Sequence, residues 1–173
     1  MLIRSISGVR GLVKTHLKPE DSVVYARAMH EYLPDGVIIV GRDSRPSGDL
    51  ILESMCEQLV QLGRTVIHCG IVPTPTVQFM VHSTEAVGGL IVTASHNPIE
   101  WNGLKFVRED STFFHPDDCR NLFKIVDQNP VIKSAKEPGI IWQEKNAVQK
   151  HLISCASLEC ISLNRIQRPR DVC

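Results

Sequence analysis

Short apolar runs alternate along the chain with longer stretches in which apolar residues recur at helical spacing. Runs such as 37–40 and 88–92 are almost wholly apolar, which is typical of strands buried on both faces of a parallel sheet. Pro19 and Gly63 are residues that favour the start and the end of a helix. The pattern predicts an α/β domain. Its expected strands are 2–7, 37–40, 64–69, 88–92 and 104–107, and its expected helices are 19–33, 50–62, 73–81, 116–126 and 143–157.

The connection between the last two expected strands limits the topology of the sheet. Residues 93–103 are too few for the helical crossover that joins parallel neighbours. The strand at 104–107 should therefore run antiparallel to the strand at 88–92. We expect a mixed sheet whose other strands are mostly parallel.

The composition is that of a globular domain without a strong charge. The chain has 173 residues, of which 43% are hydrophobic and 22% are charged, enough to build one hydrophobic core. Lys and Arg together number 19, as do Asp and Glu, so the formal net charge is zero. A neutral chain gives no electrostatic reason to expect nucleic acid or a membrane surface as a partner. Small molecules and proteins are left as candidate partners.

The sequence contains no sign of secretion or of a membrane span. No apolar run approaches the roughly 20 residues that cross a bilayer, and the N-terminus lacks the basic and apolar regions of a secretory signal. The cysteines form no paired C-x-x-C motif, so a zinc site has little support. We expect a cytoplasmic protein with reduced, structural thiols. The six cysteines are Cys56, Cys69, Cys119, Cys155, Cys160 and Cys173.

A polar turn follows the apolar run 88–92 and holds the strongest candidate for chemistry. Residues 93–98 read Thr-Ala-Ser-His-Asn-Pro. Ligands of open α/β sheets lie at the carboxyl ends of strands, where a nucleophile such as Ser95 is exposed on a rigid support. His96 and Asn97 can donate hydrogen bonds to phosphate oxygens. The chain has no G-x-S-x-G elbow and no nearby acid to complete a hydrolase triad, so phosphate chemistry is favoured over acyl transfer.

The same turn also has an ordinary structural interpretation. Ser, Asn and Pro are common in turns for local reasons, and adjacent Ser and His side chains on an extended chain point apart. On the tetrapeptide 95–98 alone, a simple turn is favoured. The surrounding segments reverse that balance.

Four segments, taken in order, resemble those of one family. Residues 89–98, followed by Asn-Gly-Leu-Lys-Phe at 102–106, look like the phosphoserine loop of the α-D-phosphohexomutases. That family contains the phosphoglucomutases, phosphomannomutases and phosphoglucosamine mutases. Residues 5–11 are similar to its N-terminal segment ending in G-I-R-G, residues 40–48 to its G-x-D-x-R-x-S-G loop, and residues 70–75 to its G-x-x-P-T-P turn. The resemblance implies a three-layer α/β/α domain with a mixed, mostly parallel sheet.

The resemblance also implies a role for each matching residue. Ser95 would be phosphorylated in the resting enzyme and would pass its phosphoryl group to a sugar monophosphate. The resulting hexose 1,6-bisphosphate would turn over in the site and return its other phosphate to Ser95. Lys105 would assist proton transfer at the attacking sugar hydroxyl, and Arg10 would face the same phosphoryl group. The implied catalytic set is Ser95, Lys105, Arg10 and His96, and the implied substrate-binding residues are Thr93 and Asn97.

Physical chemistry is consistent with these roles but does not require them. A lysine that is partly desolvated near other cations has a lowered pKa and can act as an acid or base near neutrality, which suits Lys105. Taken alone, Lys105 would be interpreted as a solvated strand lysine, and Arg10 fits a turn arginine as well as a functional one. We interpret Arg42, Asp43 and Arg45 as mainly structural, an ion-pair network that braces the loops of the site.

The sequence departs from the family where metal and sugar are bound. The family's D-G-D-x-D-R metal loop has no counterpart here, nor do the sugar-specificity and phosphate-binding loops of its third and fourth domains. Mg²⁺ prefers octahedral oxygen ligation, so with only the phosphate on Ser95 the chain should bind it weakly. We expect a fragment: residues 1–140 as the family's first domain, and residues 141–173 as a terminal helix and the start of a linker to a second domain. Alone it should have little or no mutase activity.

Two other functions stay open. The domain could be a non-catalytic sugar-phosphate-binding or interaction module, or, with less support, a phosphate-dependent hydrolase that uses Ser95. The partners expected of a mutase are a hexose phosphate, a hexose 1,6-bisphosphate and the remaining domains of the enzyme. The sequence does not choose between glucose, mannose and glucosamine phosphates.

Overall fold

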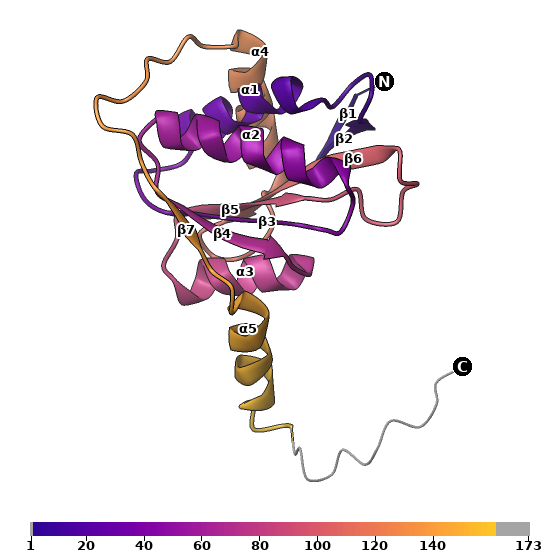
Figure 1. Cartoon of the computed structure of the whole chain (residues 1–173), viewed down its shortest axis with the longest axis vertical. Helices are drawn as coiled ribbons and strands as arrows, with labels where there is room; N and C mark the ends of the chain where they lie inside the picture. Colours follow the sequence, from indigo (N-terminus) through magenta and orange to yellow (C-terminus); the bar gives the residue numbers. More distant parts are fainter. Residues whose placement is uncertain (1, 162–173) are drawn as a thin grey trace.

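A seven-stranded mixed sheet forms the centre of the domain, and helices cover both of its faces (Figure 1). The computed structural model describes residues 2–161. One face carries α1 (Pro19–Tyr32), α2 (Ser47–Gln61) and α4 (Pro116–Gln128), and the other carries α3 (Thr74–Ser83), against which α5 (Ala147–Ala156) packs. In spatial order the strands are β1 (Ile3–Ser5), β2 (Gly8–Leu12), β6 (Trp101–Arg108), β5 (Gly88–Val92), β3 (Ile38–Arg42), β4 (Val66–Ile71) and β7 (Ile141–Gln143). The expected three-layer α/β/α architecture is confirmed.

The central strands show how the sequence builds the three layers. Ile38 and Val40 of β3 pack into the core beneath α1 and α2, whereas Ile39 between them joins the apolar cluster formed with α3. Leu90 and Ile91 of β5 divide between the two faces in the same way. Because side chains alternate along a strand, an unbroken apolar run is buried on both faces.

The sheet divides into a parallel and an antiparallel half. β5, β3, β4 and β7 pair in parallel, whereas β1, β2, β6 and β5 pair antiparallel. β6 runs antiparallel to β5, as the short connection predicts. Within residues 2–161 three pairings are parallel and three are antiparallel, so the sheet is mixed without the expected parallel majority. The difference comes from the N-terminus, which adds two antiparallel strands beside β6.

The N-terminal segment forms a hairpin where the apolar pattern predicts one strand over residues 2–7. The Ser7 amide donates to Ser5 Oγ across the turn at 3.2 Å, and Gly8 leaves it with a φ of 103°. A Cβ on Gly8 would lie 2.0 Å from the carbonyl oxygen of Leu104, so only glycine fits there. The turn places Arg10 inside β2, paired with β6, and not in a loop.

The C-terminal part differs from the prediction in one element. Residues 141–143 form β7, which pairs with β4, and α5 starts at Ala147 instead of near residue 143. All three residues of β7 are exposed, so the strand has no buried face that an alternating pattern could reveal. The linker predicted after the terminal helix lies outside the described residues, which end at Ile161.

Arg64 binds the carbonyl groups that end α1. Its side chain is 4% exposed and donates to the carbonyl oxygens of His30 at 2.7 Å and Leu33 at 2.8 Å, and also to that of Pro34. The last carbonyls of a helix lack partners within it and carry a partial negative charge, so a buried guanidinium stabilises them. Arg64 therefore connects the end of α1 to the start of β4.

Replacing Arg64 by methionine should lower the free energy of unfolding by about 2–4 kcal/mol, because buried carbonyl groups lose their partners. Urea denaturation followed by circular dichroism measures the change. Arg120→Met is the matched control, since Arg120 is 66% exposed and pairs with Asp117 on the surface of α4. Its effect should stay within about 0.5 kcal/mol. An Arg64→Met protein as stable as the wild type would contradict this role.

Candidate active site

Two loops meet at the carboxyl edge of the parallel strands. The loop after β3 covers residues 43–46, and the loop after β5 covers residues 93–100. β3 and β5 are parallel neighbours, so both loops leave the sheet at the same edge. The Asp43 amide donates to the carbonyl of Val92 at 3.0 Å, which fixes the first loop against the end of β5. Such an edge is where ligands of open α/β sheets bind.

Ser95 has an unusual backbone conformation in the second loop. Its φ is 59°, in the left-handed region that few residues other than glycine adopt. The Ser95 amide donates to Thr93 Oγ1 at 3.0 Å, and the Asn97 amide donates to the Ala94 carbonyl at 3.2 Å. Ser95 is exposed, whereas Thr93 is 6% exposed. The buried and hydrogen-bonded start of this loop thus supports the exposed hydroxyl of Ser95.

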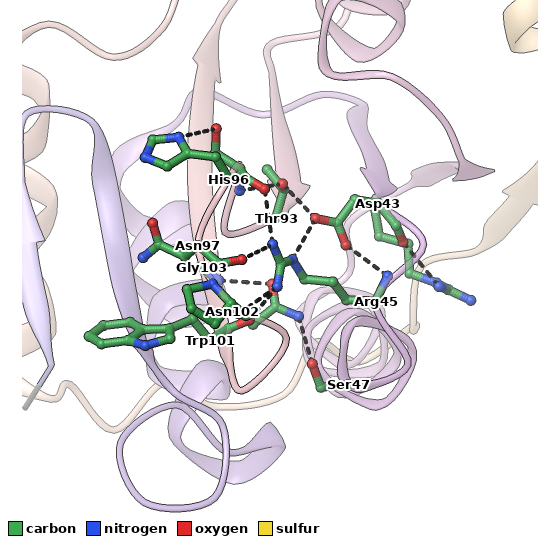
Figure 2. Close-up of polar contacts among 12 residues, drawn as sticks. Asp43, Arg45, Ser47, Thr93, His96, Asn97, Trp101, Asn102 and Gly103 are labelled. Carbon is green, nitrogen blue, oxygen red and sulfur yellow. Dashed lines mark hydrogen bonds and ion pairs between the residues drawn. The ribbon is translucent and has the colours of Figure 1, made fainter.

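Asp43 and Arg45 connect the two loops. Arg45 Nε donates to the Asp43 carboxylate at 3.1 Å, and Thr93 Oγ1 donates to the same carboxylate oxygen at 2.7 Å. Figure 2 shows the Arg45 side chain extending from its own loop into the second loop. There it donates to the carbonyl oxygens of Ser95 at 2.9 Å and Asn97 at 2.6 Å. The interpretation of Asp43 and Arg45 as a brace between the loops is confirmed.

Arg42 contributes to the same region from the end of β3. Its guanidinium lies 2.7 Å from the Asp49 carboxylate in the first turn of α2 and donates to the Asp43 carbonyl at 3.2 Å. An acid in the first turn of a helix is also favoured by the helix dipole. Arg42 therefore fixes the start of α2 relative to the first loop.

Asn102 ties the start of α2 to β6. It is fully buried, its Nδ2 donates to Ser47 Oγ at 3.0 Å, and its Oδ1 accepts from the Gly103 amide at 2.8 Å (Figure 2). Both side-chain polar groups are thus paired, as burial of an amide requires. The sequence prediction gave Asn102 and Ser47 no role of their own. The Asn-Gly pair after the serine turn is the signal that could have identified them.

Gly103 permits close packing of three strands beside the serine loop. Gly103 pairs with Arg10 of β2, and its carbonyl accepts from the Thr93 amide at 2.9 Å. A Cβ at this position would lie 2.5 Å from the Val9 carbonyl oxygen, 2.8 Å from that of Thr93 and 3.2 Å from Arg10 Cγ. Because Gly103 has no Cβ, the Arg10 side chain can lie over it, next to Thr93 at the start of the loop after β5.

Arg10 and Lys105 lie on the same face of the sheet. Lys105 is two residues beyond Gly103, the partner of Arg10, so the two side chains share one face. Lys105 pairs with Ile91, which belongs to the apolar cluster of α3, so this is the α3 face. Partial burial and then the positive charge of Arg10 lower the pKa of Lys105. Lys105 Nζ also lies 5.3 Å from the centre of the Phe113 ring.

The predicted site residues thus form two groups. Thr93, Ser95, His96 and Asn97 belong to the loop after β5, and Arg10 with Lys105 lies on the α3 face of β2 and β6. His96 is exposed, and its Nδ1 is 3.5 Å from Ser95 Oγ, the outer limit of a hydrogen bond. A cavity of about 410 Å³ adjoins the serine and is lined by Asp43, Ser44, Arg45, Pro46, Ser95, Asn97 and Ile99.

The described part of the chain offers few ligands for a metal ion. Among residues 2–161 no three His, Cys, Asp or Glu side chains come together in a way that could hold one. Those residues also include no helix that is both long and apolar enough to cross a membrane. Burial raises the pKa of Cys56 and of Cys69 to about 12, which keeps both thiols protonated and unreactive.

Comparison with known proteins points to one family. Residues 2–131 match the family described as phosphoglucomutase/phosphomannomutase, alpha/beta/alpha domain I. The chain is 40% identical to a phosphoglucosamine mutase of Acaryochloris marina, over 78% of this chain and 30% of that protein. It is 31% identical to a phosphoglucosamine mutase of Methanococcus aeolicus, over 91% of this chain and 34% of that protein.

A solved structure resembles the fold over most of the chain. It is a phosphoglucomutase/phosphomannomutase family protein from Burkholderia thailandensis, with a TM-score of 0.69 and 27% identity. The match covers 87% of this chain and 35% of that one. The chain therefore spans about a third of the length of the relatives that it matches.

Gly103→Ala should destabilise the domain by about 2–3 kcal/mol, because the new methyl group would overlap two backbone carbonyl oxygens that cannot easily move. Gly48→Ala is the matched control: the nearest atom to its Cβ lies at 3.4 Å, and alanine is the better helix former. Thermal unfolding of both variants measures the difference. Equal melting temperatures for the two variants would show that the close approach at Gly103 is not limiting.

The lowered pKa of Lys105 should make its amine unusually reactive, because only the neutral amine attacks acylating reagents. Removal of the neighbouring positive charge in Arg10→Met should raise that pKa and slow acetylation of Lys105 at pH 8. Competitive labelling with acetic anhydride and peptide mass spectrometry measures the rate. Arg120→Met serves as the control and should leave the rate unchanged. An unchanged rate in Arg10→Met would show that Arg10 does not influence Lys105.

Proposed function

The chain belongs to the phosphoglucomutase/phosphomannomutase family through its alpha/beta/alpha domain I, and from this premise we propose that Ser95 carries the phosphoryl group in the isomerisation of a hexose phosphate. The observation that supports this most directly is the backbone of Ser95. Hydrogen bonds fix it on both sides in a left-handed conformation while the hydroxyl stays exposed. A group that gives and receives phosphoryl groups needs this combination of rigid support and access.

The proposed reaction consists of two transfers. In the first, a hydroxyl oxygen of the sugar phosphate bonds to the phosphorus on Ser95 Oγ, the hydroxyl proton leaves to a base, the Oγ–P bond breaks, and Ser95 Oγ takes up a proton. In the second, Ser95 Oγ gives up its proton and bonds to the phosphorus of the other phosphate of the bisphosphorylated sugar, the bond from that phosphorus to the sugar oxygen breaks, and the sugar oxygen takes up a proton. The serine is phosphorylated again at the end, so atoms and charges balance. Positioning and charge stabilisation dominate such transfers.

Lys105 and Arg10 fit the charge and proton requirements of this scheme. We assign Lys105 to proton transfer at the sugar hydroxyl, because its lowered pKa favours a neutral amine that can accept a proton. Arg10 on the same face supplies a positive charge for the phosphoryl oxygens.

His96 beside the Ser95 hydroxyl stays a candidate catalytic residue, and Asn97 is assigned to the binding of substrate and phosphate. Thr93, also expected to bind substrate, has its hydroxyl paired with the Ser95 amide and the Asp43 carboxylate, so we assign it to the support of the loop.

The names of the relatives support the proposed substrate class. Two are called phosphoglucosamine mutase and one a phosphoglucomutase/phosphomannomutase family protein, so we propose a hexose phosphate as substrate and a hexose 1,6-bisphosphate as intermediate. Mg²⁺ would stabilise phosphate charge when bound. Residues 2–161 contain no cluster of carboxylates that could hold the ion, so the ligand proposed from this chain is the phosphate on Ser95 alone. No step above depends on the ion. We propose that full turnover needs groups from further domains, and that this chain alone has little mutase activity.

Exposure to a hexose 1,6-bisphosphate should add one phosphoryl group to the chain, on Ser95, because the bisphosphate is the proposed donor in the second transfer. Intact-mass measurement and phosphopeptide mapping detect it. Ser95→Ala should abolish the gain in mass. Ser44→Ala is the matched control, since Ser44 lines the same cavity and should leave the gain intact. Binding of the sugar phosphate without modification of Ser95 would instead indicate a non-catalytic binding module.

A further inference from the structure

We infer that Arg45 is a positioning residue that sets the conformation of the Ser95 backbone and has no hydrogen-bond donor left for a phosphate. An arginine beside a phosphorylated serine would ordinarily be assigned to phosphate binding, since guanidinium groups pair well with phosphate. The inference rests on the proposed role of Ser95 as phosphoryl carrier. It concerns how the loop after β5 is held, and its first test does not need that role to be correct.

All five N–H groups of the Arg45 guanidinium are committed. Nε donates to the Asp43 carboxylate at 3.1 Å. The four remaining N–H groups meet four carbonyl oxygens, three in the loop after β5 and one at the first residue of β6. These acceptors are Ser95 at 2.9 Å, Asn97 at 2.6 Å, Pro98 at 2.7 Å and Trp101 at 3.3 Å. A phosphate could therefore reach this guanidinium only by displacing a backbone carbonyl oxygen. The carbonyls of Ser95 and Asn97 have no other hydrogen-bond donor within residues 2–161, whereas that of Pro98 also accepts from the Trp101 amide at 3.0 Å.

The Ser95 backbone lies inside a closed ring of hydrogen bonds. Its amide donates to Thr93 Oγ1 at 3.0 Å, which donates to the Asp43 carboxylate at 2.7 Å. That carboxylate accepts from Arg45, and Arg45 donates to the Ser95 carbonyl. Both polar groups of the Ser95 peptide backbone are thus fixed from opposite sides. The ring supplies the constraint that a non-glycine residue needs in order to stay at a φ of 59°.

Lysine cannot replace arginine here. The carbonyl acceptors belong to residues 95, 97, 98 and 101, and the planar guanidinium contacts them through two separate nitrogens while Nε faces Asp43. An ammonium group is a single point with three donors and would leave several of these carbonyls without partners. The side chain of Arg45 is 13% exposed, so water would not fully replace the lost donors.

The first test measures the loop directly. In Arg45→Lys, hydrogen exchange of the amides of Asn97 and Trp101 should accelerate at least about tenfold, while exchange in β3 and β5 stays as in the wild type. Arg64→Lys is the matched control: Arg64 also binds backbone carbonyls, but at the opposite edge of the sheet. It should lower overall stability without selective exchange in the loop. Unchanged loop exchange in Arg45→Lys, or an equal rise throughout the chain, would overturn the inference.

The second test separates positioning from phosphate binding. With a hexose 1,6-bisphosphate as donor, Arg45→Lys should lower the maximal rate of Ser95 phosphorylation by about 100-fold and leave the half-saturating donor concentration within about twofold. A higher half-saturating concentration with an unchanged maximal rate would mean that Arg45 binds the phosphate, which overturns the inference. A wild-type chain that accepts no phosphoryl group would overturn the proposed function instead, and the exchange measurement would then decide the role of Arg45 alone.

Discussion

The ion pair between Asp43 and Arg45 is the interaction on which the geometry of the carboxyl edge depends. The antiparallel return of β6 beside β5 leaves a connection of few residues, which makes a tight loop whose carbonyl groups have no strand to pair with. Unpaired backbone groups of this kind are costly unless a donor is supplied. Arg45 supplies donors from the neighbouring loop, and Asp43 balances its charge and orients it. The conformation of the loop after β5 therefore depends on the loop after β3.

Much of the fold follows from the sequence, because its core strands are simple. Residues 38–40 and 88–92 are buried on both faces of the sheet, and their apolar character does not depend on register. The antiparallel direction of β6 follows from the short connection between β5 and β6 alone. The apolar pattern does not predict β2 and β7, because neither strand depends on an apolar run. β2 depends on a left-handed glycine in a turn, and β7 has only exposed residues, so neither produces a periodic pattern.

The candidate site was predictable to a different extent. Ser95 and the residues around it could be located because a reactive side chain is a residue type that the sequence shows directly. The left-handed backbone of Ser95 could not be, since its cause lies in contacts with Thr93 and Arg45. Arg45 was assigned to a brace, but its carbonyl partners were not foreseeable, because a carbonyl acceptor is independent of residue type. Asn102 and Gly103 act through burial and close approach, and these appear only when three strands come together.

Arg45 and Arg64 show one chemistry used for two purposes. Each places a guanidinium among backbone carbonyls, Arg64 at the end of α1 and Arg45 in the loop after β5. At Arg64 the result is stability, because the carbonyls are buried and lie at the negative end of a helix. At Arg45 the acceptors are carbonyls on either side of the turn that presents the Ser95 hydroxyl, and the result is a defined conformation of the loop. The pairing that satisfies a helix end at Arg64 therefore holds a strained backbone at Ser95, because a non-glycine residue stays at a φ of 59° only where its surroundings constrain it.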